Sequence, residues 1–65
     1  MRILVNGAWR ETPAVLLTEA LEQLGYAESV VCTAVNGEFV AVAARTRVQL
    51  REGDALEVLA PMQGG

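Results

Sequence analysis

The C-terminus of the chain offers a distinct kind of chemistry. The sequence ends with the segment Ala60-Pro61-Met62-Gln63-Gly64-Gly65. The carboxylate of Gly65 is ionised at neutral pH and is a poor electrophile until it gains a leaving group. Because glycine has no side chain, a Gly-Gly end lets the backbone approach another molecule closely. The six residues reach at most about 20 Å.

The other reactive residue types do not form a catalytic set. The chain has no His and one Cys, which excludes a Cys-His or Ser-His pair, a disulfide framework and a Cys/His zinc site. Cys32 lies in a Val-rich run and is predicted to be a small buried core residue. Glu19 and Glu22 have the spacing of a solvated helix face. The glycines match neither the dinucleotide fingerprint nor the P-loop.

Charge limits the partners of the chain. The net charge is −3, so nucleic acid is an unfavourable partner and a basic protein surface a favourable one. All five basic residues are Arg, and Arg45, Arg47 and Arg51 are interpreted as a solvated loop group. Trp9 is interpreted as a packing anchor or a cover of the sheet.

Length and composition predict one domain. A chain of 65 residues, 52% of them hydrophobic, has a thin core, so function is expected on a surface or a terminus. The longest apolar run, Phe39–Ala44, is too short to span a membrane. The N-terminus has no pattern of a secretory signal. We therefore expect a cytoplasmic protein.

The first half of the chain predicts a hairpin followed by a helix. The side chains of Arg2–Asn6 alternate between the two faces of a strand. Asn6-Gly7 suits a type I′ turn, and Ala8–Thr12 would form the returning strand of the hairpin. Leu17, Ala20, Leu21 and Leu24 have helical spacing. Thr12 is predicted to cap this helix, with Pro13 at its first position and Gly25 at its end; Val15 and Leu16 fit either a strand end or a first turn.

The second half predicts three more strands. Val30–Val35 reads as a buried strand, and Asn36-Gly37 reverses it into Glu38–Val42. After a weaker pattern and the turn Glu52-Gly53-Asp54, Ala55–Leu59 alternates again, with Leu56 and Val58 inward and Leu59 outward. The order β-β-α-β-β-β predicts an α+β fold, a ubiquitin-like β-grasp with a mixed sheet on one main helix. Residues 1–59 would form the domain and residues 60–65 a flexible tail.

These features together resemble the ThiS family, the bacterial sulfur-carrier proteins of thiamine biosynthesis. The resemblance covers the whole chain and combines the element order, Val35-Asn36-Gly37, the Glu-Gly-Asp turn and the terminal Gly64-Gly65. The family often has a Pro and an aromatic residue where this chain has Ala41-Val42-Ala43-Ala44-Arg45. A Pro near the C-terminus, here Pro61, is also similar to the related molybdopterin sulfur carriers.

The resemblance implies a carrier role and not an enzymatic one. It implies that an E1-like adenylating enzyme of the ThiF type uses ATP to adenylate Gly65, and that a sulfur donor converts the adenylate to a thiocarboxylate. A thiazole synthase of the ThiG type would then receive the sulfur. The chain itself would bind no cofactor and no metal, and would be a monomer when free. Gly64, Gln63, Met62, Pro61 and Leu59 are the expected contacts with partners.

Three alternatives remain open from the sequence. The chain suits a molybdopterin-type sulfur carrier, a ubiquitin-like protein modifier, or a noncovalent interaction module whose Gly-Gly end is accidental. The noncovalent module predicts that the last two residues are dispensable. A modifier with no Lys could not build lysine-linked chains on itself.

Overall fold

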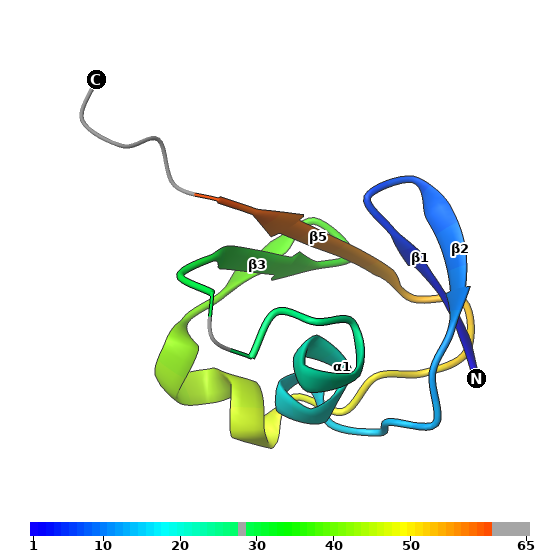
Figure 1. The fold of residues 1–65 in the computed structure, drawn as a ribbon, viewed down its shortest axis with the longest axis horizontal. Coiled ribbons are helices and arrows are strands. Elements are labelled where there is room, and N and C mark those ends of the chain that lie inside the picture. The colour runs from blue at the N-terminus through cyan, green and yellow to red at the C-terminus, as the bar shows by residue number, and fades with distance from the viewer. Residues whose placement is uncertain (28, 61–65) are drawn as a thin grey trace.

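A five-stranded mixed sheet packs against one main helix (Figure 1). The computed structural model describes residues 1–27 and 29–60. The elements are β1 (Arg2–Val5), β2 (Ala8–Glu11), α1 (Leu17–Gln23), β3 (Cys32–Val35), β4 (Glu38–Val40), the 3₁₀ helix η1 (Val42–Arg47) and β5 (Ala55–Leu59). The strand order is β2-β1-β5-β3-β4, with β1 and β5 parallel and the other neighbours antiparallel. The predicted β-grasp order is confirmed, with η1 added.

Both hairpins turn at the predicted Asn-Gly pairs. Asn6 and Gly7 have φ of 48° and 85°, and Asn36 and Gly37 have φ of 51° and 84°. Positive φ at both central residues is the requirement of a type I′ turn, which matches the twist of the strands that it joins. The two turns thereby fix the registers β1–β2 and β3–β4.

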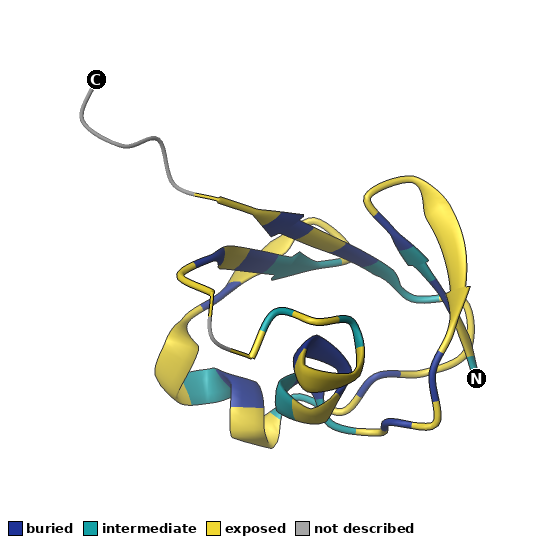
Figure 2. Ribbon diagram, viewed as in Figure 1, coloured by how far each residue is buried: buried dark blue, intermediate teal, exposed yellow. Residues whose placement is uncertain are grey.

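The core lies between the sheet and α1. Leu56 and Val58 of β5, Ile3 of β1, and Leu17 and Leu21 of α1 are all buried. Figure 2 shows buried and exposed residues alternating along β5, which is the middle strand of the sheet. In the described ranges 1–27 and 29–60, no helix lies on the opposite face of the sheet (Figure 1). Among the described residues, no helix is long and apolar enough to span a membrane.

The predicted start of the helix is wrong. Helix α1 begins at Leu17, not after a Thr12 cap with Pro13 in the first turn. The reason is tertiary: Leu16 forms a β-bridge with Gln49, and the N–H of Leu17 donates to the carbonyl of Val48 at 2.9 Å. Thr12 is instead buried, and its Oγ1 accepts from the N–H of Ala14 at 3.1 Å. The predicted end is confirmed, because Gly25 follows the last turn with φ of 92°.

The third and fourth strands are shorter than expected. β3 begins at Cys32, and Val30 is 81% exposed. β4 ends at Val40, where the sequence predicted a strand to Val42, because the chain turns into η1 at Val42. The N–H of Ala44 donates to the carbonyl of Ala41 at 2.9 Å, an i to i+3 bond typical of a 3₁₀ turn.

Candidate functional site

The end of β5 is the part of the fold that delivers the C-terminal segment. Leu56 and Val58 point into the core, and Leu59 is 61% exposed, as predicted. The expected partner contacts Pro61, Met62, Gln63 and Gly64, and the expected reactive residue Gly65, lie outside the described residues. Their roles remain predictions. The described structure defines the base from which they start, at the end of the sheet's middle strand.

Two asparagine side chains hold β5 in place. Asn6 Nδ2 donates to the carbonyl of Val58 at 3.0 Å, and the N–H of Val58 donates to Asn6 Oδ1 at 2.8 Å. Near the other end of β5, the N–H of Ala55 donates to Asn36 Oδ1 at 2.9 Å, while Asn36 Nδ2 donates to Asp54 Oδ1 at 3.0 Å. The residues that form the two hairpin turns therefore also fix the strand that carries the tail. The sequence predicted the turns but not this second role.

An exposed apolar patch surrounds the end of β5 on the open sheet face. We define the apolar patch as Cys32, Ala34, Phe39 and Leu59, which line one hollow together with Thr33 and Glu57. The register pairs Cys32 with Leu59, and Ala34 with both Glu57 and Phe39. Directly paired residues point to the same side of a sheet, so these side chains share one face. Phe39 is 71% exposed, which makes the patch available to a partner.

Cys32 belongs to this patch and not to the core, so its predicted burial is wrong. Its neighbours Val31 and Thr33 are buried, and strand alternation turns Cys32 to the open side. The Val-rich composition of the run gave no indication of which alternate positions face inward. The pairing of Cys32 with the exposed Leu59 determines that Cys32 lies on the open face.

Arg45 is buried, which corrects its interpretation as a solvated residue. Its Nε donates to Thr33 Oγ1 at 3.1 Å, and its Nη2 donates to the carbonyl of Val31 at 2.6 Å. Thr33 Oγ1 in turn donates to the carbonyl of Val40 at 2.9 Å. Arg45 thereby fastens η1 to β3. Arg47 and Arg51 are exposed, as expected.

Trp9 covers the open face at the other end of the sheet. It is 52% exposed, and the guanidinium of Arg2 lies 4.7 Å from the centre of its ring. Trp9 pairs with Leu4, and Leu4 pairs with Ala55 on the adjacent strand. Of the two predicted roles, sheet cover is therefore the correct one.

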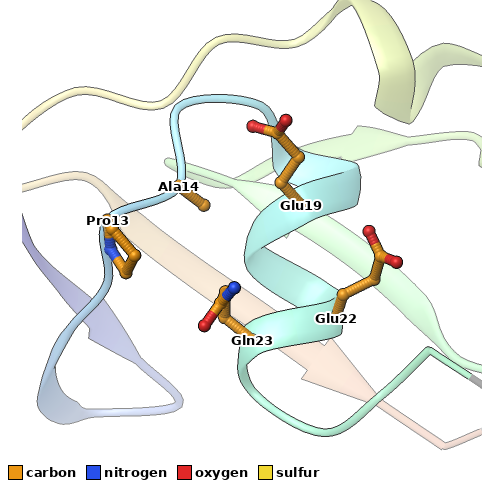
Figure 3. Close-up of a pocket in the computed structure, with 5 residues that line it drawn as sticks. All are labelled: Pro13, Ala14, Glu19, Glu22 and Gln23. Atoms are coloured by element: carbon orange, nitrogen blue, oxygen red, sulfur yellow. The ribbon is translucent and has the colours of Figure 1, made fainter.

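The paired carboxylates of α1 form no acid-base site. Figure 3 shows the open pocket beside the helix, lined by Pro13, Ala14, Glu19, Glu22 and Gln23. Glu19 Oε1 accepts from the N–H of Leu16 at 3.3 Å and so supports the start of the helix. Both carboxylates are exposed, as predicted. Across residues 1–27 and 29–60, His, Cys, Asp and Glu form no group that could hold a metal ion.

Comparison with known proteins decides the family. The ThiS family model matches residues 3–65, which is nearly the whole chain. The chain belongs to the ThiS family. It is a sulfur carrier protein of thiamine biosynthesis. A comparison with curated protein sequences found no match.

Solved structures agree with this assignment. The crystal structure of a thiamine biosynthesis protein (ThiS) from Geobacter metallireducens superposes with a TM-score of 0.86 at 32% identity and covers both chains completely. A solution structure of a thiamine biosynthesis protein from the same organism has a TM-score of 0.78 at 32% identity, over 100% of this chain and 88% of that one. The fold that presents the C-terminal segment is thus shared with the family.

Proposed function

We propose that this ThiS-family chain carries sulfur as a thiocarboxylate on Gly65. The observation that supports this most is that β5, the middle strand of the sheet, ends at an exposed Leu59 and is followed in sequence by a Gly-Gly terminus. The folded domain is the base of the C-terminal segment, and the reacting group is the terminal carboxylate. The chain acts as the substrate of its partner enzymes.

The chemistry begins with activation of the carboxylate. An E1-like enzyme of the ThiF type transfers the adenylyl group of ATP to the Gly65 carboxylate and releases pyrophosphate. The terminal sulfur of a persulfide donor then attacks the carbonyl carbon, and AMP leaves with the carboxylate oxygen. A second thiol then attacks the donor's sulfur in the resulting acyl disulfide. A new disulfide forms between this thiol and the donor, and the thiocarboxylate leaves with one sulfur on Gly65. ATP is a cosubstrate of the partner enzyme, and the proposed reaction takes place in the cytoplasm.

The tail needs help from the folded body to bind its partner. Ordering the six residues 60–65 costs about 1–2 kcal/mol for each residue, so contacts elsewhere must offset part of this cost. Leu59 is placed for such contact, because it is exposed at the end of β5 and belongs to the apolar patch. Within the activation channel of the enzyme, the contacts with the tail would be made by Pro61, Met62, Gln63 and Gly64. A thiazole synthase of the ThiG type then receives the sulfur.

Deleting Gly64 and Gly65 tests the proposal. The parent chain, incubated with ATP, its adenylating enzyme and a sulfur donor, should gain the mass difference between sulfur and oxygen in an intact-mass spectrum. The truncated chain should gain nothing. Its urea midpoint should equal that of the parent, because no core residue is removed. A truncated chain that still gains sulfur would overturn the assignment of Gly65.

A further inference from the structure

Glu57 places a carboxylate inside the apolar patch. It faces Ala34 across the β3–β5 ladder and lines the same hollow as Phe39 and Leu59. Leu59 lies two residues along the same strand and therefore points to the same side. The remaining residues that line the hollow are Cys32, Thr33 and Ala34, so Glu57 is the one charged residue among those that line it.

The carboxylate of Glu57 is exposed and has no partner in the described part of the chain. Across residues 1–27 and 29–60, no hydrogen bond or ion pair engages this side chain, in contrast to Asp54 and Glu19, which accept from backbone N–H groups. Glu57 is exposed. Nothing in the described fold requires an acid at this position, because the β3–β5 ladder is made by backbone groups.

A partner that covers the apolar patch must also cover this carboxylate. Removing an ionised carboxylate from water is strongly unfavourable unless a cation and hydrogen-bond donors replace the water. A partner with an entirely apolar surface would therefore bind the patch weakly. A partner surface that places an Arg or Lys opposite Glu57, and apolar side chains against Phe39 and Leu59, would bind the patch well.

We infer that Glu57 is a specificity-determining residue for the enzyme that activates Gly65, and that this enzyme presents a cation to it on an otherwise apolar surface. The inference rests on the proposed function. Two features of the molecule favour the activating enzyme as the protein that covers the apolar patch. The patch includes Leu59 and so adjoins the tail that the enzyme must hold, and the net charge of −3 favours a basic partner surface.

Glu57→Gln, compared with Glu22→Gln, tests this inference. The two variants change net charge equally, but Glu22 is exposed on α1, on the far side of the sheet from the patch. Both positions are exposed, so both variants should unfold at the urea midpoint of the parent. Affinity for the adenylating enzyme is measured by calorimetry at low and at high salt, and loading of Gly65 is measured at saturating enzyme by intact mass.

The expected result separates the two variants. Glu57→Gln should raise Kd about tenfold or more, because the partner's cation loses its counter-charge. Its Kd should also depend less on salt, while Glu22→Gln should bind like the parent in both respects. At saturating enzyme, both variants should still be loaded with sulfur, because the tail is intact.

The outcomes distinguish this inference from the proposed function. Equal Kd values for the two variants, or tighter binding by Glu57→Gln, would overturn the role of Glu57 even if the parent is loaded normally. A parent chain that binds the enzyme in a Glu57-dependent way but gains no sulfur would support the docking inference and overturn the proposed chemistry. A parent that neither binds nor loads overturns both.

Discussion

Arg45 donates two buried side-chain hydrogen bonds that join η1 to residues 31 and 33. Replacing it by Met keeps much of the buried stem but removes the donors to Thr33 Oγ1 and to the Val31 carbonyl. The carbonyl of the buried Val31 then lacks its side-chain donor, which costs about 1–3 kcal/mol. Urea denaturation should show this loss for Arg45→Met. Arg47→Met in the same 3₁₀ helix, where the side chain is exposed, should stay within about 0.5 kcal/mol of the parent. Equal values for both variants would mean that Arg45 is not a structural tie.

At the same scale, sequence reasoning succeeded where a residue's role follows from its neighbours in the chain. The positive φ of Gly25 and the outward direction of Leu59 are of this kind. It was wrong for Cys32 and Arg45. Their positions depend on β-strand register and on a contact between segments more than ten residues apart, and composition near each residue carries no signal of either.

Among the elements, β5 is held by side chains from both hairpin turns, and its anchoring by Asn6 can be tested. Asn6→Gly tolerates the left-handed turn but removes both side-chain bonds to Val58. Because these bonds are half-buried, we expect a loss of about 1–3 kcal/mol in the free energy of unfolding. Amide exchange at Val58 should also become faster. Asn36→Gly is the matched control: it has the same backbone change, but its lost bonds are exposed, so its effect should be smaller. A larger effect at Asn36 would contradict this explanation.

The element order was predictable because each strand and the helix carry their own periodicity. The start of α1 was not, because the bridge between Leu16 and Gln49 overrides the local preference of Thr12 and Pro13 for a helix N-terminus. η1 was missed for a related reason. Val42–Arg47 has no strong period, and its position is fixed by the hydrogen bond from Arg45 to Thr33 of β3.

At the scale of the whole molecule, the chain presents very few amines to an activated tail. It contains no Lys, and the N-terminal amine of Met1 donates to the carbonyl of Thr12 at 2.8 Å and lies 3.9 Å from Glu11 Oε2. We expect the loaded parent to stay free of carrier–carrier conjugates. Arg47→Lys and Arg51→Lys each place an amine at an exposed site, and mass spectrometry after loading should reveal covalent dimers. If both variants load as cleanly as the parent, the absence of Lys reflects composition and has no protective effect.

The parallel pairing of β1 with β5 also sets how the molecule responds to a pulling force. β1 starts at the N-terminal end of the domain, and β5 leads to the C-terminal segment. A force that draws these two ends apart therefore pulls neighbouring strands in opposite directions along their length. The backbone bonds from Leu4 to Asp54 and from Asn6 to Leu56, together with the Asn6 side-chain bonds to Val58, are then loaded in shear and at the same time. Unzipping would load such bonds one after another. The domain should consequently resist a force applied between its N-terminal end and the end of β5 far better than its size suggests.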